Sequence, residues 1–396
     1  MDRVKAAGVF IACALILVAI AVQPALANPG TRRDSLISFL SNRYDAAEGG
    51  YSLTGETVSR IESTEAAAMI LNDLGYLDAR PPMIDLVKMK NFTQKLQWMS
   101  GGESHERYGG FASYIAGPTS VENTHLALQL WTILSNQSNI PRIDQVVMNV
   151  TAALMYINKT QTSLGGFGAA TGSSPDVIST YHALWSLNSL FGLKSDETWE
   201  KWLRNRTATV EWILSCRVGD SFKLSPGSTV TGLEPTAAAI LALDILGELP
   251  SVSGLDGIKN WILGRQVTEP IRGEFEGGFE EGYLTNDTNL VSTYYALTSL
   301  VALGFLSQCN ETAVAQFIID SQAADGSWGS VPGISVGTLP NAALAVNSLL
   351  ILGQTGLLLE EDPNNPNAPL LDWRVLVVAG ILIVAIAAAL VAMRMD

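Results

Sequence analysis

Residues 165–190 read GGFGAATGSSPDVISTYHALWSLNSL, and this stretch decides the fold. It begins with a Gly-Gly-aromatic signal, and an apolar segment opened by Thr180 and Ala183 follows. A pair of glycines permits a tight turn at positive φ. The Gly-aromatic signal recurs, in places with Ser for Gly, about every 50–60 residues, which is typical of a repeat protein. The aromatic residues of the six copies are Tyr51, Phe111, Phe167, Phe222, Phe279 and Trp328.

A second signal keeps step with the first. A Thr with an Ala three residues later follows each aromatic and opens an apolar segment. A helix that is apolar on every face is buried, so these segments are predicted to form an inner ring of helices. Glycines that can end a helix follow five of them, at Gly75, Gly192, Gly247, Gly304 and Gly353. The predicted pairs are Thr64/Ala67, Thr124/Ala127, Thr180/Ala183, Thr236/Ala239, Thr293/Ala296 and Pro340/Ala343.

A more polar, amphipathic segment precedes each Gly-aromatic signal and is predicted to form an outer helix. A unit of two helices cannot bury its inner helix alone, so the units must stack. The first and last inner segments are as apolar as the others, which favours a closed ring over an open solenoid. The sequence therefore predicts an all-α fold, an α6/α6 toroid of six helical hairpins over residues 28–354. The outer segments are 33–43, 83–99, 143–157, 196–216, 255–265 and 311–323.

Both ends of the chain are predicted to lie outside this toroid. Residues 1–27 have a basic start, an apolar run and an Ala-x-Ala site, as in a signal peptide; the alternative is an uncleaved anchor. Residues 375–393 are an uncharged apolar run long enough for a transmembrane helix. A linker, 355–374, separates it from the toroid. We expect a single-pass cell-membrane protein with an extracytoplasmic toroid.

Composition limits the partners. The chain of 396 residues carries 38 Asp and Glu against 24 Lys and Arg, so it lacks the basic charge expected for nucleic-acid binding. Cys216 and Cys309 are assigned to distant repeats, and we expect two free, buried thiols. Seven N-x-S/T sequons agree with an exported glycoprotein: Asn91, Asn136, Asn149, Asn158, Asn205, Asn286 and Asn310.

The repeat resembles that of the prenyltransferase and terpene-cyclase superfamily of α/α toroids, over about residues 31–354. In protein prenyltransferase β subunits, this resemblance implies a catalytic zinc held by an Asp-x-Cys at the fifth inner helix and a His at the sixth. Here Ser292 and Tyr294 stand at the Asp and Cys positions, and the sixth helix starts Leu339-Pro340-Asn341 without His. The zinc ligands are thus missing, and we predict no cofactor. The positions implied for the diphosphate-binding residues fall near Asn286 and Asn289, which are uncharged.

Two further chemistries of this superfamily also lack their residues. The sequence has no Asp-x-Asp-Asp segment, with which the related cyclases protonate their substrate. Neither Cys216 nor Cys309 begins the Cys-Gly-Glu-Gln of thioester proteins. The resemblance therefore predicts the fold more specifically than the function.

In such a ring the inner helices begin around a central mouth, and the residue after each Thr would face it. Glu65, Glu122 and His125 come from adjacent units and could bind a metal or act as acid and base. The alternative is that Glu62 and Glu122 only stabilise helix N-termini. We expect His182 to pack in the core and His105 to lie in an exposed loop. The predicted mouth residues are Glu62, Glu65, Glu122, His125, Tyr181, Glu234, Tyr294 and Asn341.

Two classes of function remain open. The first is a membrane-anchored module that binds a ligand or a surface protein in its central pocket, without the zinc prenyl-transfer site. The second is an enzyme, either a divergent prenyltransferase or terpenoid cyclase, or a toroid carbohydrate-active enzyme. The missing ligands favour the first class, and the apolar pocket with its Glu and His residues favours the second.

Overall fold

The computed structural model describes residues 30–77, 84–137, 148–191, 199–268, 275–282 and 288–363. The chain divides into two compact units, one of residues 36–357 and one of residues 1–35 with 358–396. In the described part of the terminal unit, Thr31 pairs antiparallel with Glu361, and the Arg32 N–H donates to the Glu360 carbonyl at 3.0 Å.

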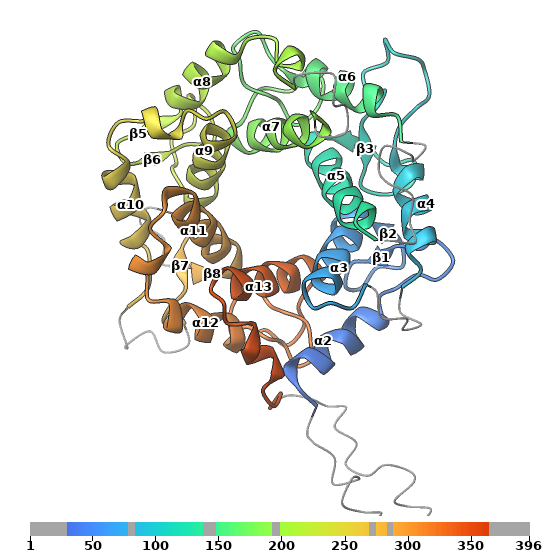
Figure 1. The fold of residues 1–396 in the computed structure, drawn as a ribbon, viewed down its shortest axis with the longest axis vertical. Coiled ribbons are helices and arrows are strands. Elements are labelled where there is room, and N and C mark those ends of the chain that lie inside the picture. The colour runs from blue at the N-terminus through green and yellow to red at the C-terminus, as the bar shows by residue number, and fades with distance from the viewer. Residues whose placement is uncertain are drawn as a thin grey trace, which may run out of the picture. The chain divides into compact units, whose positions relative to one another are not determined.

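Residues 36–357 form a closed double ring of helices, which Figure 1 shows from one end. Each inner helix packs against the next, and the last, α13, packs against the first, α3. In the described residues the inner ring consists of α3 (Ile61–Asp73), α5 (Val121–Ser135), α7 (Val177–Phe191), α9 (Leu233–Ile245), α11 (Leu290–Leu303) and α13 (Leu339–Ile351). The predicted toroid is confirmed.

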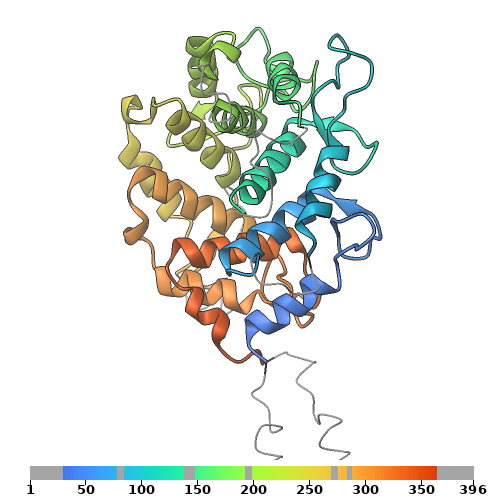
Figure 2. The ribbon, with the colours of Figure 1, turned by 45° about the vertical axis from the view of Figure 1, so that its right-hand side comes forward.

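The outer helices alternate with the inner ones along the chain and lie around them (Figure 2). The described outer helices are α2 (Arg32–Ser41), α4 (Leu86–Leu96), α6 (Val150–Thr160), α8 (Arg206–Ser215), α10 (Leu255–Leu263) and α12 (Glu311–Asp320). Short 3-10 turns are η2 (Trp199–Trp202), η3 (Leu249–Ser251), η5 (Leu306–Gln308) and η6 (Thr355–Leu359). Four of the predicted inner-helix-ending glycines have positive φ, namely Gly75, Gly247, Gly304 and Gly353; Gly192 lies outside the described residues.

The prediction of an all-α fold with a transmembrane helix is wrong in two respects. The chain between turn and inner helix folds back on itself, and its backbone groups pair as small antiparallel ladders. No described helix is long and apolar enough to cross a bilayer. The predicted signal peptide, 1–27, and span, 375–393, lie outside the described residues. The described ladders are β1 (Tyr51–Ser52) with β2 (Ser59–Arg60), β3 (Phe111–Ala112) with β4 (Thr119–Ser120), β5 (Arg217–Val218) with β6 (Ser221–Phe222), and β7 (Phe279–Glu280) with β8 (Thr288–Asn289).

A hydrogen bond explains why the aromatic residue and the Thr recur at a nearly constant distance from each other. Thr180 Oγ accepts the backbone N–H of Phe167 at 3.0 Å and donates to the Asp176 carbonyl at 2.7 Å. The hydroxyl therefore ties the aromatic residue to the first turn of the inner helix. The same pair of bonds is made by Thr64, Thr124, Thr236 and Thr293, each to the aromatic residue of its own copy.

The sixth copy shows where the predicted register fails. Thr is the fourth residue of α3, α5, α7, α9 and α11, and the fourth residue of α13 is Ala342. The predicted pair Pro340/Ala343 is therefore two residues out of register, and Ala342/Ala345 is the matching pair. In this copy Ser327 Oγ accepts the Gly337 N–H at 2.7 Å, and the Trp328 indole donates to Ile318.

Neighbouring repeats are joined at the first residue of five described inner helices, α3, α5, α7, α9 and α11. The Val121 N–H donates to the Ala169 carbonyl of the next repeat at 2.9 Å, and Val177 donates to Leu224 at 2.9 Å. Each acceptor lies two residues after the next aromatic. A helix N–H that has no partner inside its helix is thus satisfied by the adjacent repeat. The remaining pairs are Ile61 with Ser113, Leu233 with Glu281, and Leu290 with Ser330.

Replacing Thr180 by Val tests the Thr–aromatic bond. The Phe167 N–H would be left buried without an acceptor, and we expect the free energy of unfolding to fall by about 1–3 kcal/mol. Guanidinium denaturation measures the change. Thr132→Val is the matched control, since the exposed Thr132 hydroxyl donates only to its own helix at Leu128, and its cost should stay within about 0.5 kcal/mol. Equal losses in the two variants would contradict this role of Thr180.

Candidate functional site

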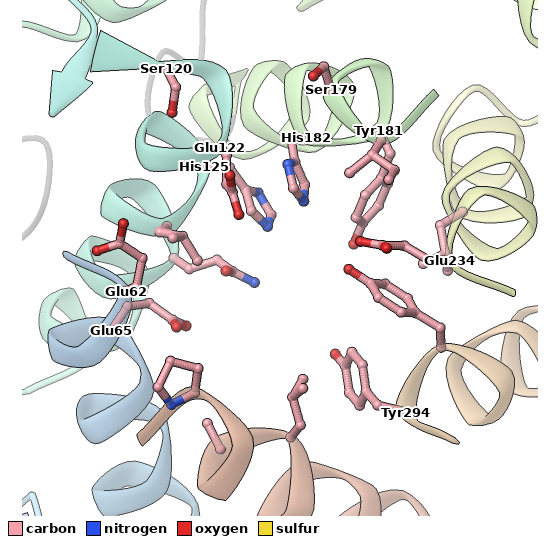
Figure 3. Close-up of a pocket in the computed structure, with 18 of the residues that line it drawn as sticks. Glu62, Glu65, Ser120, Glu122, His125, Ser179, Tyr181, His182, Glu234 and Tyr294 are labelled. Atoms are coloured by element: carbon pink, nitrogen blue, oxygen red, sulfur yellow. The ribbon is translucent and has the colours of Figure 1, made fainter. Parts of the chain in front are cut away.

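The inner helices surround a central cavity of about 710 Å³. The second, fifth, sixth and ninth residues of α3 and α5 line it, which is the spacing of one helix face. Because the Thr bond fixes where each inner helix begins, equivalent residues of different repeats meet around the same space. Figure 3 shows their side chains pointing into it.

The structure places all but one of the predicted mouth residues around this cavity. Asn341 is not among the lining residues, because α13 begins two residues later than the predicted register. The fifth residue of α13 is Ala343, and it lines the cavity instead. Those that do line it are Glu62, Glu65, Glu122, His125, Tyr181, Glu234 and Tyr294.

Two of these side chains are buried without a partner for one of their polar atoms. Glu65 and His125 are each 5% exposed, and neither Glu65 Oε1 nor His125 Nδ1 has a hydrogen-bond partner. A buried polar group without a partner destabilises a fold by about 1–3 kcal/mol. Burial, with a smaller contribution from Asp73, raises the pKa of Glu65 to about 8. The empty site thus keeps a protonated carboxyl group near neutral pH.

Aromatic rings line the same cavity as Glu65. The imidazole of His125 stacks on that of His182, with ring centroids 4.5 Å apart and an interplanar angle of 14°. Trp185 meets His125 edge-on at 4.5 Å, and Tyr181 lies at 5.9 Å. Burial lowers the pKa of His182 to about 4, and burial and His182 lower the pKa of His125 well below its usual value. Both imidazoles are therefore neutral at physiological pH.

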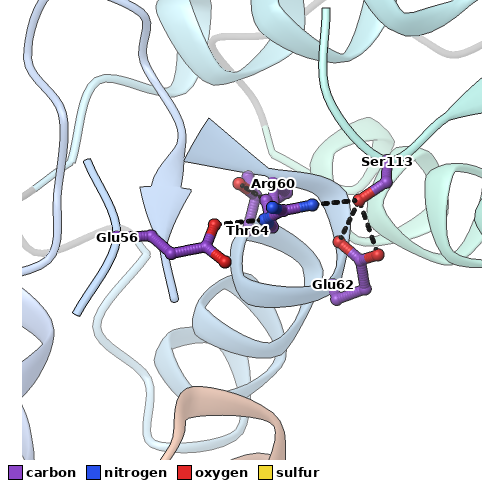
Figure 4. A network of polar contacts seen from close by, with 5 residues as sticks. All are labelled: Glu56, Arg60, Glu62, Thr64 and Ser113. Atoms are coloured by element: carbon purple, nitrogen blue, oxygen red, sulfur yellow. Dashed lines mark hydrogen bonds and ion pairs between the residues drawn. The ribbon is translucent and has the colours of Figure 1, made fainter. Parts of the chain in front are cut away.

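Glu62 differs from Glu65 because it has partners (Figure 4). Ser113 Oγ, from the next repeat, donates to the two Glu62 carboxylate oxygens at 2.7 and 2.9 Å. Arg60 donates to Ser113 Oγ at 3.3 Å and pairs with Glu56. This network holds Glu62 at the edge of the cavity. Among the described contacts, the Glu62 side chain accepts from Ser113 and from no backbone N–H of its own helix.

Further carboxylates accumulate at the starts of the inner helices. Burial, then Glu62 and Asp176, raises the pKa of Glu122. Burial, then Glu281 and Glu122, raises the pKa of Glu234, and Glu281 Oε1 accepts the Glu234 backbone N–H at 3.4 Å. Among the lining residues, all of them described, there is no Lys or Arg. The negative charge of the cavity is therefore not balanced from within its wall.

Several lining residues were missed by the sequence analysis. His182 was expected to pack in the core, but it lines the cavity at the sixth position of α7. Tyr295 and Gln129 line it from the sixth and ninth positions of their helices, and Asp176 caps α7 through Ser179 at 2.7 Å. The Thr column marks only the fifth position. The helical spacing of i, i+1 and i+4 from that position would have found His182, Tyr295 and Gln129.

Metal binding by Glu65, Glu122 and His125 is not supported by the geometry. Within the described ranges, no three His, Cys, Asp or Glu side chains are placed so that they could hold one metal ion. At the positions that resemble the zinc ligands, Ser292 is buried and Tyr294 lines the cavity. Cys216 and Cys309 are free and buried, as predicted.

Six of the seven sequon asparagines lie in the described residues. Asn149, Asn205 and Asn310 cap the outer helices α6, α8 and α12, and their side chains accept backbone N–H groups at 2.9, 3.0 and 3.2 Å. These three, with Asn91 and Asn136, are exposed. Asn158 is half-buried and donates to Trp202 at 2.6 Å, and Asn286 lies outside the described residues. The N-x-Thr pattern of three sequons thus has a structural role in helix capping.

The sequence matches the family described as the prenyltransferase alpha-alpha toroid domain, over residues 5–215 and 172–334. The chain therefore belongs to the prenyltransferase alpha-alpha toroid family, as its repeat predicted. No curated protein is matched by its sequence.

Solved structures of different activities share this fold. Candida albicans protein geranylgeranyltransferase-I complexed with GGPP is 16% identical, with a TM-score of 0.62 over 84% of this chain and 94% of that one. A variant of the Scytonema type II terpene cyclase MstE, in complex with merosterolic acid A, is 13% identical, with a TM-score of 0.50 over 81% and 95%. A glycosidase variant in complex with glucose is 11% identical, with a TM-score of 0.53 over 82% and 97%. At these identities the likeness shows the fold alone.

Because the pKa of Glu65 is raised in the folded chain, the free energy of unfolding should depend on pH. Between its usual pKa of 4.5 and its folded-state pKa of about 8, the unfolded chain releases a proton that the folded chain keeps. The free energy of unfolding should therefore fall as pH rises through this window. Glu65→Gln cannot ionise, so it should be about as stable as the parent at pH 4 and more stable by about 3–5 kcal/mol at pH 9.

Guanidinium denaturation at pH 4, 7 and 9 measures this difference. Glu211→Gln, on the exposed side of α8, makes the same chemical change away from the cavity and should leave the pH profile of stability unaltered. A gain from Glu65→Gln that is the same at every pH would contradict the buried, protonated carboxyl.

Proposed function

We propose that this toroid binds a small molecule in its central cavity, without the zinc prenyl-transfer chemistry found in part of its family. The observation that carries the proposal is the pair of buried, unpartnered atoms in the cavity wall, Glu65 Oε1 and His125 Nδ1. A polar group of this kind is commonly completed by a ligand or a water molecule. The cavity volume also falls within the range of small-molecule sites, about 300–1,000 Å³.

The absence of a zinc-thiolate step rests on side-chain chemistry. Zinc prefers thiolate, imidazole and carboxylate ligands, and Ser292 and Tyr294 supply none of these. The carboxylates of the wall, without a Lys or Arg among the lining residues, disfavour a diphosphate. An extracytoplasmic location remains a proposal, which the five exposed sequon asparagines support. Binding of a protein partner at the mouth explains the site less well, because the unpartnered atoms of Glu65 and His125 belong to side chains that line the cavity.

Filling the cavity tests the proposal. Ala343 is 5% exposed and lines the cavity from α13, so Ala343→Trp should occupy part of the space. A mixed library of neutral, cationic and anionic fragments is screened against the full chain by ligand-detected NMR. We expect fragments that bind the parent to lose at least about tenfold in affinity for the variant, since a bulky ring removes volume and contacts.

The control variant places the same residue on the surface. Leu164 is 65% exposed, and Leu164→Trp should keep the fragments bound. Thermal unfolding of both variants checks that they remain folded. A screen without hits, or hits that Ala343→Trp leaves unchanged, would refute binding in the central cavity.

A hydrolytic enzyme is the second candidate, and one observation favours it. Glu65 keeps its proton to about pH 8, as a general acid must, and Glu122 lines the same cavity from the next helix. The similarity in fold to a glycosidase is consistent with this candidate. Release of nitrophenol from aryl glycosides by the parent chain, lost in Glu65→Gln, would favour it over simple binding.

A further inference from the structure

We propose that the ligand of the central cavity is an organic ammonium ion, a positively charged nitrogen on an apolar body. This inference rests on the proposed binding function and names its ligand class. It is drawn from three features of the wall: its carboxyl groups without a Lys or Arg among the described lining residues, an unpartnered buried carboxyl, and aromatic rings that line the same cavity.

The charge of the wall selects for a cation. Five carboxyl side chains line the cavity and no described lining residue is a Lys or Arg, so the wall disfavours an anion. A low-dielectric pocket lined by one sign of charge concentrates ions of the other sign. The five are Glu62, Glu65, Glu122, Asp176 and Glu234.

Glu65 distinguishes this wall from an ordinary acidic surface. Its neighbour Glu62 is satisfied by Ser113, and Asp176 is satisfied by Ser179, whereas Glu65 Oε1 is buried and unpartnered. A buried carboxylate is normally paired with a cation or saturated with hydrogen bonds. Since the wall supplies neither, a cationic ligand would complete the site.

The rings on the wall favour an organic cation over a bare metal ion. Tyr181, Tyr294 and Tyr295 line the cavity with the two stacked imidazoles. Aromatic faces attract ammonium groups, most strongly where water is excluded. Met69, Leu241 and Leu344 add apolar surface for the body of such a molecule. Within the described chain, no cluster of three metal-ligating side chains competes for the same role.

Proton release should accompany binding. With the cavity empty, the Glu65 carboxyl holds its proton up to a pKa of about 8, and an ammonium ion binds the ionised form. The groups that face Glu65 are Glu62 and Asp73 on α3, Glu122 and His125 on α5, and Tyr294 on α11; the lining residues of α13 carry no titratable group. The pKa of Glu122 is also raised, so its ionisation should likewise increase the affinity for a cation as pH rises, and His125 stays neutral. Affinity should therefore increase from pH 6 to pH 9.

The test compares choline with 3,3-dimethylbutan-1-ol, its uncharged isostere, on the full chain by saturation-transfer NMR. We expect choline to bind at least about tenfold more tightly than the isostere at pH 9, and at least about tenfold more tightly at pH 9 than at pH 6. Choline is charged at both pH values, so this change reports on the protein. Glu65→Gln should lose about tenfold in choline affinity and the pH dependence together, whereas Glu211→Gln should keep both.

Several outcomes would overturn the inference. These are equal binding of choline and its isostere, no choline binding at millimolar concentration, or full choline affinity in Glu65→Gln. Glucose serves as a third probe. Binding of glucose or of neutral fragments that Ala343→Trp abolishes, with no preference for choline, would refute the ammonium ligand and leave the central binding site standing.

Discussion

One hydrogen bond sets the geometry on which the rest of this toroid depends. A Thr hydroxyl in the first turn of an inner helix accepts the backbone N–H of the aromatic residue 13 or 14 positions earlier. It fixes the loop between them and the residue at which the helix begins. The next residue, such as Glu65 or His125, must then face the centre of the ring. The cavity is thus a consequence of the repeat.

In four of the repeats a glycine of the turn lies close against the following outer helix, at Gly49, Gly109, Gly165 and Gly277. A Cβ on Gly109 would lie 1.9 Å from the carbonyl oxygen of Ala152 in α6, and one on Gly277 would lie 2.0 Å from that of Ala313 in α12. Gln97 continues this contact, because its amide donates to Gly109 and to Asn149 and accepts from the Asn149 N–H. Backbone groups at this joint are thus satisfied by the Gln97 side chain.

The sequence predicted the positions that the repeats share, and it missed positions at which a single repeat differs from the others. The Thr column located Glu65, His125, Tyr181 and Tyr294, because the fifth residue of the inner helix lines the cavity in five of the six described copies. Asn341 was misplaced because α13 has Ala342 where the marker should stand. The β-ladders were missed because two-residue strands are too short for an alternating pattern. The burial of Glu65 depends on neighbouring helices, which no local pattern encodes.

The threonine hydroxyls that tie each aromatic residue to its inner helix are not among the side chains that line the cavity, and this separation explains how one fold accommodates different sites. Thr180 and Gly165 face the joints between elements, and Glu65 and His125 face the centre. Neither of the latter completes a bond that the fold needs. Their unpartnered atoms destabilise the fold, and a ligand that completes these atoms explains that cost better than packing does. Ser292 and Tyr294 can therefore stand where zinc ligands are expected while the toroid is kept.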